Sequence, residues 1–131
     1  KFRRSGIYLG YLFQITDDIL GVWGLEKETG KSIGSDLKRK KNSLPIVHAM
    51  AASSKSSKSV IQRVYSKEEL SDNDVQEILE ILETSESRVY CQDLAEIYAR
   101  KAINVIRDAN IEPEKLKEYQ DLCEYLTVRK F

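Results

Sequence analysis

Two adjacent aspartates, Asp17 and Asp18, lie inside a segment that is otherwise almost entirely apolar, residues 7–23. The apolar side chains of this segment cover most of a helical wheel, which is typical of a buried helix. An unpaired charge in such a helix is strongly unfavourable, so the carboxylates need a cation or a wet cavity beside them. On the helical period, Gln14, Asp17 and Gly21 fall on one strip. We therefore expect this strip to face a polar cavity that contains basic side chains or a divalent metal.

A loop rich in glycine and lysine follows this helix over residues 23–42, before Ser43 and Pro45 begin another helix. Hard cations such as Mg²⁺ prefer carboxylate oxygens, keep several waters and share phosphate oxygens as ligands. An acidic buried helix followed by a lysine-bearing loop therefore indicates a site for a metal ion and a phosphorylated ligand. In this interpretation Lys31 and Lys41 neutralise the phosphate charge.

Several alternatives remain open at this loop. Lys38 or Lys40 takes the role of Lys41 if the register of the loop differs. Asp36 either coordinates metal through water or orients Lys31. The structural alternative for the aspartate pair is a helix end whose carboxylates bond to neighbouring lysines or to the backbone.

The run FQITDD…GKSIGSDL…KKNSLP resembles the second aspartate-rich region of the trans-type isoprenyl diphosphate synthases. Members share FQ-x-x-DD-x-x-D, then G-K-x-x-G-x-D, then a lysine shortly before a helix start. The resemblance covers the whole chain, including a basic tail at residues 129–131, but only the C-terminal half of the family's fold. It implies an all-α helical bundle of the isoprenoid synthase type, with residues 1–131 as the C-terminal portion of a polyprenyl synthetase-like domain.

The resemblance implies a prenyltransferase that condenses an allylic diphosphate with isopentenyl diphosphate in isoprenoid chain elongation. The expected mechanism is ionisation of the allylic diphosphate, dependent on Mg²⁺ or, as an alternative, Mn²⁺. Members are commonly homodimers, which makes a homodimer the expected assembly. The residues assigned to this chemistry are Asp17 and Asp18 as catalytic metal ligands together with Asp36 as a metal ligand, Lys31 and Lys41 as catalytic contacts to the diphosphate, and Gln14 as a further diphosphate contact.

Two departures from the family pattern bear on activity. Gly21 stands where the family usually has its third aspartate, and the family's first aspartate-rich motif does not occur in these residues. We therefore expect the isolated chain of 131 residues to be inactive. Two other functions remain open: a non-catalytic regulatory subunit that resembles a prenyl synthase, and a terpene cyclase on the same fold.

Composition limits the number of domains, the kinds of partner and the cellular setting that the chain suggests. A chain of 131 residues suits one domain, and 21 acidic against 21 basic residues give no argument for nucleic acid or an acidic membrane surface. Cys91 and Cys123 lie in apolar helical patterns, which favours reduced cysteines of a cytoplasmic protein. No apolar run is long enough to cross a membrane. Because the sequence opens without methionine and inside a helical pattern, it suggests a cleaved, shortened or split protein.

The apolar periodicity predicts helices and no strands. The expected helices cover residues 1–22, 43–52 and 60–65, then one from Ser71 or Asp72, one from Ser85 or Ser87, and a last one after Pro113. Residues 53–59, rich in serine and lysine, are expected to be a surface turn. The first helix is apolar on nearly all faces, so we expect an exposed apolar surface that associates with missing N-terminal helices or with another copy.

Overall fold

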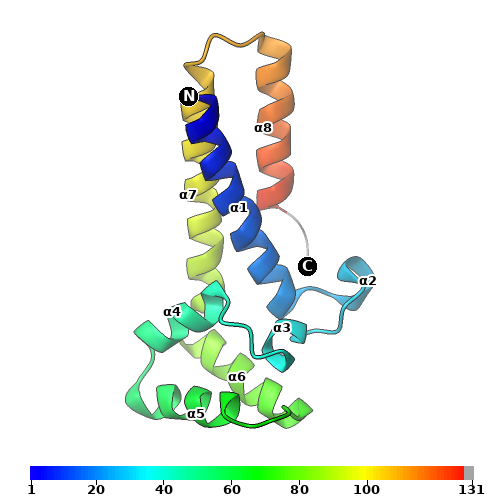
Figure 1. Ribbon diagram of the computed structural model, residues 1–131, viewed down its shortest axis with the longest axis vertical. Helices are drawn as coiled ribbons and strands as arrows, with labels where there is room; N and C mark the ends of the chain where they lie inside the picture. Colours follow the sequence, from blue (N-terminus) through cyan, green and yellow to red (C-terminus); the bar gives the residue numbers. More distant parts are fainter. Residues whose placement is uncertain (129–131) are drawn as a thin grey trace. The chain divides into compact units, whose positions relative to one another are not determined.

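The computed structural model describes residues 1–128, so the predicted basic tail at residues 129–131 lies outside the described residues. Within the described residues the secondary structure is entirely helical, as the sequence predicts (Figure 1). The helices are α1 (Phe2–Trp23), α2 (Glu26–Thr29), α3 (Ser35–Lys38), α4 (Leu44–Ala52), α5 (Lys55–Tyr65), α6 (Asp72–Thr84), α7 (Ser87–Arg107) and α8 (Pro113–Thr127).

The chain divides into two compact units. Among the described residues, the first contains residues 1–17 and 92–128, and the second contains residues 18–91. Long helices cross the boundary, because α1 passes into the second unit after Asp17 and α7 passes into the first unit after Cys91. Among residues 1–128, no helix is both long enough and apolar enough to span a membrane.

In the first unit, α1 packs against α7 and α8 through a seam of small and polar side chains. The hydroxyl of Ser5 donates to the carbonyl oxygen of Ala102 at 2.8 Å and lies 2.7 Å from the hydroxyl of Tyr119. Thr16 Oγ1 donates to the carbonyl oxygen of Leu126 at 3.2 Å. Small side chains let helices approach closely, and one stripe of α7 supplies them. The buried alanines of that stripe are Ala95, Ala99 and Ala102, and Ile106 continues it with a larger buried side chain.

In the second unit, α4, α5 and α6 contact one another in pairs, and α3 packs on α6. Their aliphatic side chains form one core, whose buried members are Val22, Leu37, Ile46, Ala49, Ile61, Val64, Val75, Ile78, Ile81 and Leu82. Two sequence predictions at the edge of this unit are confirmed: Ser71 caps α6 through a capping box, and Pro45 lies in the first turn of α4. Cys91 and Cys123 are buried and form no disulfide with each other.

The surface turn predicted for residues 53–59 is wrong for most of its length, because α5 already begins at Lys55. The side chain of Ser54 accepts a hydrogen bond from the backbone N–H of Ser57 and so starts the helix. Serine-rich sequence therefore forms a helix start here. The predicted loop of residues 23–42 likewise contains the single-turn helices α2 and α3.

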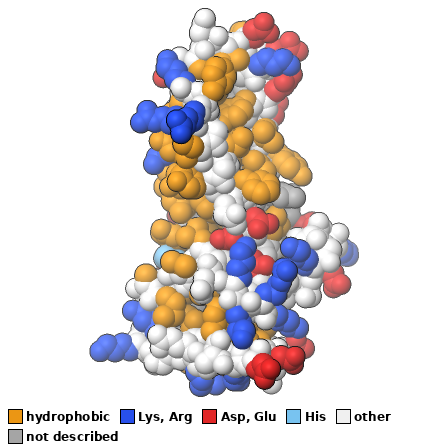
Figure 2. All heavy atoms as spheres, viewed as in Figure 1, with side chains coloured by type: hydrophobic (Ala, Val, Ile, Leu, Met, Phe, Trp, Pro, Cys, Tyr) orange, Lys and Arg blue, Asp and Glu red, His pale blue; other side chains and the backbone are white. Residues whose placement is uncertain are grey.

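The first half of α1 carries large apolar side chains that the described residues do not cover. Figure 2 shows hydrophobic side chains along this part of the helix. The exposed large hydrophobic residues of α1 are Phe2, Ile7, Tyr11 and Phe13. This agrees with the expectation of an exposed apolar surface on the first helix.

Candidate functional site

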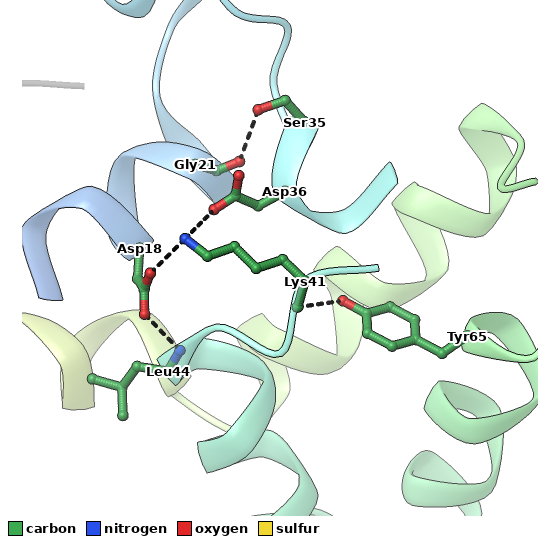
Figure 3. A network of polar contacts seen from close by, with 7 residues as sticks. All are labelled: Asp18, Gly21, Ser35, Asp36, Lys41, Leu44 and Tyr65. Carbon is green, nitrogen blue, oxygen red and sulfur yellow. Dashed lines mark hydrogen bonds and ion pairs between the residues drawn. The ribbon is translucent and has the colours of Figure 1, made fainter. Parts of the chain in front are cut away.

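A cluster of charged side chains joins α1 to the loop that leads into α4 (Figure 3). The ammonium group of Lys41 donates to Oδ1 of Asp18 at 3.0 Å and to Oδ2 of Asp36 at 3.3 Å. Both carboxylates are nearly inaccessible, with side-chain exposures of 9% and 7%, whereas the Lys41 side chain is 39% exposed. The cluster is therefore a pair of buried carboxylates that share one ammonium group open to solvent.

Asp18 also supports the start of α4. Its Oδ2 accepts a hydrogen bond of 2.9 Å from the backbone N–H of Leu44, the first residue of that helix. The first N–H groups of a helix have no partner inside the helix, and a negative charge there is favourable. The carboxylate of Asp18 thus links the end of α1, the Lys41 ammonium and the beginning of α4.

Hydrogen bonds join the start of the short helix α3 to the last turn of α1. The backbone N–H of Gly34 donates to the carbonyl oxygen of Val22 at 3.0 Å, and the hydroxyl of Ser35 donates to the carbonyl oxygen of Gly21 at 3.4 Å. These bonds satisfy carbonyl groups that a helix leaves unpaired at its C-terminal end. They also bring the carboxylate of Asp36 against Gly21, where a β-carbon would overlap it.

The charge states in the cluster follow from these contacts. Burial alone would lower the pKa of Lys41, but its hydrogen bond to Asp18 and the charges of Asp18 and Asp36 raise the pKa above its ordinary value of 10.5. Lys41 is therefore a permanent cation.

Nearby, the hydroxyl of Tyr65 donates to the carbonyl oxygen of Lys41 at 3.3 Å. Burial, and then the charge of Asp36, raise the pKa of Tyr65 to about 12.

Comparison with known proteins shows to which family this chain belongs. A sequence profile described as polyprenyl synthetase matches residues 1–82, which include the whole charged cluster. The chain belongs to the polyprenyl synthetase family. It is similar to the geranylgeranyl diphosphate synthase of Saccharolobus solfataricus, with 33% identity over 122 residues that cover 91% of this chain and 36% of that protein. The chain thus spans little more than a third of the length of that relative.

Solved structures of polyprenyl synthetases share the fold. A polyprenyl synthase from Caulobacter crescentus, complexed with calcium and isoprenyl diphosphate, has a TM-score of 0.83 and 27% identity, covering 98% of this chain and 39% of the other. A geranylgeranyl pyrophosphate synthase from Corynebacterium glutamicum, complexed with isoprenyl diphosphate and magnesium, has a TM-score of 0.87 and 23% identity, covering 97% and 36%. The second likeness establishes the fold alone.

Within this member of the polyprenyl synthetase family, the loop lysines have different partners. Lys38 forms an ion pair with Asp72 at 2.8 Å, and Lys40 donates to the carbonyl oxygen of Lys67 at 2.7 Å. Lys41 is the loop lysine that reaches the buried carboxylates. Lys38 and Lys40 are engaged by the first residue of α6 and by the connection before it, and the role of Lys41 as a diphosphate contact remains a prediction.

The other predicted site residues lie outside this cluster. Gln14, Asp17 and Lys31 are all exposed. The backbone N–H of Lys31 donates to the Thr29 hydroxyl, and that hydroxyl donates to the Lys31 carbonyl oxygen, in the loop after α2. Adjacent helical residues project about 100° apart, which separates the direction of Asp17 from that of Asp18. The roles of Gln14, Asp17 and Lys31 remain predictions.

The expected metal set of Asp17, Asp18 and Asp36 does not form a three-carboxylate group. Among residues 1–128, no three histidine, cysteine, aspartate or glutamate residues lie close enough to hold a metal ion. An ammonium group already lies between Asp18 and Asp36. The donors nevertheless fit Mg²⁺ in kind, because this ion is usually held by one or two carboxylates and completed by water and phosphate oxygens.

Sequence reasoning did not identify Tyr65 or the connection between α5 and α6 as support for the site. Tyr65 ends a predicted helix 24 positions after Lys41 along the chain, and no local motif marks it. The lysine run of residues 38–41 gave no sign that two of its members bond to residues after α5. The tertiary contacts of Tyr65, Lys67 and Asp72 with the loop reveal this support.

Proposed function

We propose that the protein containing these residues is a trans-type prenyltransferase that condenses an allylic diphosphate with isopentenyl diphosphate. The observation that supports this most directly is the Asp18–Lys41–Asp36 cluster, because it lies on the aspartate-rich motif of a polyprenyl synthetase. Two carboxylates and a permanent cation at one place suit a metal-bound diphosphate, whose oxygens bind both metal and ammonium groups.

The residues of the chain would act through charge. Asp17 and Asp18 would hold Mg²⁺ or Mn²⁺, with Asp36 beside them, and the bound metal would neutralise charge on the diphosphate. Lys41 and Lys31 would stabilise the negative charge that develops on the leaving diphosphate as the allylic C–O bond breaks. Lys41 is suited to this role because its ammonium is partly exposed and already oriented by the two carboxylates.

Gln14 would form a further hydrogen bond to the diphosphate from the same strip of α1 as Asp17. The double bond of isopentenyl diphosphate would then attack the allylic cation, and loss of a proton would give the longer chain. We further propose that the exposed apolar face of α1, including Phe2, Tyr11 and Phe13, packs against the remainder of the fold or a second copy in a homodimer.

The test is turnover of the full-length protein with Mg²⁺, a short allylic diphosphate and labelled isopentenyl diphosphate. Asp17→Ala should lower kcat by orders of magnitude while the helical circular dichroism spectrum is unchanged. Lys31→Met should lower kcat as well, whereas its control Lys27→Met, an exposed lysine of α2, should not. The isolated chain of 131 residues should show no turnover.

The outcomes separate the candidate functions. Full turnover in Asp17→Ala would contradict the proposed role of the aspartate pair. Absence of turnover in the full-length protein, with or without a partner subunit, would favour a regulatory subunit. Conversion of the allylic diphosphate without isopentenyl diphosphate would indicate a terpene cyclase.

A further inference from the structure

His48, in the middle of α4, reaches the start of α7 and the turn before it through two serine hydroxyls. Its Nδ1 lies 2.8 Å from Oγ of Ser87, and that oxygen lies 2.7 Å from Oγ of Ser85. The Ser85 hydroxyl in turn donates to the carbonyl oxygen of Leu82 at 3.3 Å. Ser87 is completely buried, so its hydroxyl depends on protein groups for its hydrogen bonds.

The direction of this row of hydrogen bonds follows from its last acceptor. A carbonyl oxygen only accepts, so the one proton of the Ser85 hydroxyl is used on Leu82. The Ser85 oxygen therefore accepts from Ser87, and the Ser87 oxygen accepts from His48. Nδ1 of His48 thus carries a proton, which fixes the tautomer of the neutral ring.

The ring of His48 is also fixed in orientation. Tyr90, in the same first turn of α7 as Ser87, stacks on it with ring centroids 4.1 Å apart and an angle of 15° between the planes. The stack acts on the face of the ring and the hydrogen bond acts on its edge. The His48 side chain therefore joins α4 to the start of α7 in one defined orientation.

This junction lies one helical turn from the contact between α4 and Asp18. Leu44 and His48 are four residues apart on α4 and therefore share one of its faces. The N–H of Leu44 donates to Oδ2 of Asp18 at 2.9 Å. On α7, Cys91 follows Ser87 by four residues, and burial, then the charge of Asp18, raise the pKa of its thiol to about 12. The faces of α4 and α7 that meet at His48 therefore also carry groups next to Asp18.

We propose that His48 is a positioning residue for Asp18, because its bond to Ser87 holds α4 where the N–H of Leu44 binds the Asp18 carboxylate. This inference rests on the proposed function, since Asp18 acts in that reaction. The backbone hydrogen bonds of a helix keep a single turn rigid, so a displacement at His48 also moves the N–H of Leu44. Without the His48 bond, α4 shifts and Asp18 loses a donor that orients its carboxylate.

Hydrogen exchange of the Leu44 amide in the full-length protein tests this link. Ser87→Ala and His48→Leu both remove the bond, so the amide should exchange about 10-fold faster. His48→Asn places an amide N–H near the position of Nδ1 and should restore most of the protection. Ser59→Ala removes an exposed hydroxyl of α5, and Val64→Ala weakens the core elsewhere; neither should speed exchange at Leu44.

Turnover separates a positioning role from general stabilisation. Ser87→Ala and His48→Leu should lower kcat about 10-fold, the lower end of the range for groups that support a ligand residue from behind. His48→Asn should regain most of this loss. Val64→Ala, although destabilised, should keep its kcat at temperatures where it is folded.

Unchanged exchange at Leu44 in Ser87→Ala and His48→Leu, or equal acceleration in Val64→Ala, would overturn the proposal. So would a neutral His48 ring protonated at Nε2, which nitrogen-15 NMR of the histidine-labelled, unaltered protein detects even if a variant does not fold.

Hydrogen exchange needs no turnover, which keeps this proposal separate from the proposed function. An active enzyme whose Leu44 exchange does not depend on Ser87 would overturn the role of His48 and leave the prenyltransferase proposal intact. An inactive protein whose Leu44 amide loses protection in Ser87→Ala would support the position that His48 gives to Asp18 and contradict the prenyltransferase.

Discussion

The hydroxyl of Tyr65, at the end of α5, donates a hydrogen bond of 3.3 Å to the backbone carbonyl of Lys41. This bond connects the charged cluster to a helix that contributes no charged group to it. The Lys38–Asp72 ion pair and the bond from Lys40 to the carbonyl of Lys67 support the same loop from the same side. The segment from which Lys41 reaches Asp18 is therefore positioned by the end of α5, by the connection after it and by the first residue of α6.

Replacing Tyr65 with phenylalanine tests this support. Tyr65→Phe should lower the free energy of unfolding by about 0.5–1.5 kcal/mol, because the Lys41 carbonyl loses its donor. Urea denaturation followed by circular dichroism measures this change. Tyr11→Phe, which alters an exposed tyrosine of α1, is the matched control and should change the free energy of unfolding little.

The same variant has a pH signature. The pKa of Tyr65 is raised in the folded protein to about 12 from 10.0, so the stability linked to its neutral phenol is complete below pH 10 and is lost as the pH rises through about 12. In Tyr65→Phe this part of the alkaline destabilisation should be absent. Ultraviolet titration should also lose the phenol that ionises near pH 12. If Tyr65→Phe instead removed a phenol that ionises near the ordinary tyrosine pKa of 10.0, that result would contradict the burial of this hydroxyl.

Removal of the shared cation should destabilise the fold. Lys41→Met leaves Asp18 and Asp36 without the ammonium that lies 3.0 and 3.3 Å from them. Loss of a hydrogen bond to a charged, buried group costs about 1–3 kcal/mol, and the partial exposure of Lys41 favours the lower end of this range. Chemical denaturation of Lys41→Met against Lys27→Met measures the difference.

A second substitution shows whether charge is the cause. Adding Asp36→Asn to Lys41→Met removes one of the two carboxylates that now lack a cation, so the double variant should be more stable than Lys41→Met alone. Additive losses from the two substitutions would mean that the carboxylate and the ammonium contribute independently, contrary to the shared-cation arrangement.

The sequence predicted the helices well where apolar periodicity and end signals agree. Pro45, Ser71 and Pro113 each stand at the start of an observed helix, and the apolar pattern after each continues for several turns. The start of α5 was missed because serine and lysine composition indicates a turn, whereas a single bond from the N–H of Ser57 to the side chain of Ser54 begins a helix.

The sequence predicted which residues lie in the charged cluster, but it did not predict the contacts between them. The motif identified Asp18, Asp36 and Lys41, which the structure brings together. It could not show that the carboxylate of Asp36 fills the space at Gly21, because that contact depends on how α3 folds back on α1. Contacts of this kind depend on tertiary packing, and local sequence patterns do not encode them.

The capping box of α6 should make stability depend on pH in acid. Lys67 Nζ lies 2.6 Å from Oδ1 of Asp74, and the backbone N–H of Ser71 donates to its Oδ2 at 2.9 Å. The bond from Lys67 and then that from Ser71 lower the pKa of Asp74 from 3.8 to about 2. The stabilisation is therefore complete above pH 3.8 and is lost as the pH falls through about 2.

Asp74→Asn isolates this charge, because asparagine keeps an oxygen that accepts from Ser71. The variant should be less stable than the unaltered protein at neutral pH, and the two free energies of unfolding should converge as the pH falls from 3.8 towards about 2. Urea denaturation over this pH range provides the comparison, with the exposed Asp121→Asn as control. A difference that stays constant with pH would show that packing and not ionisation of Asp74 is responsible.

Two glycines of the loop allow backbone strain to be separated from packing. Gly30 and Gly34 have φ values of +70° and +75°, in the left-handed region. A β-carbon on Gly30 would meet no atom within 4 Å, whereas one on Gly34 would lie 2.7 Å from Cγ1 of Val75 on α6. Gly30→Ala should therefore cost about 1–2 kcal/mol from backbone conformation alone.

Gly34→Ala should cost the same amount plus about 1–3 kcal/mol for overpacking against Val75. Val75→Ala in the Gly34→Ala background removes the obstructing methyl group, so it should recover part of the second cost, while in the unaltered protein it should only destabilise. Chemical denaturation of the four variants measures each contribution. Equal losses in Gly30→Ala and Gly34→Ala would mean that α3 does not press on α6, and the support of Asp36 from that side would then be absent.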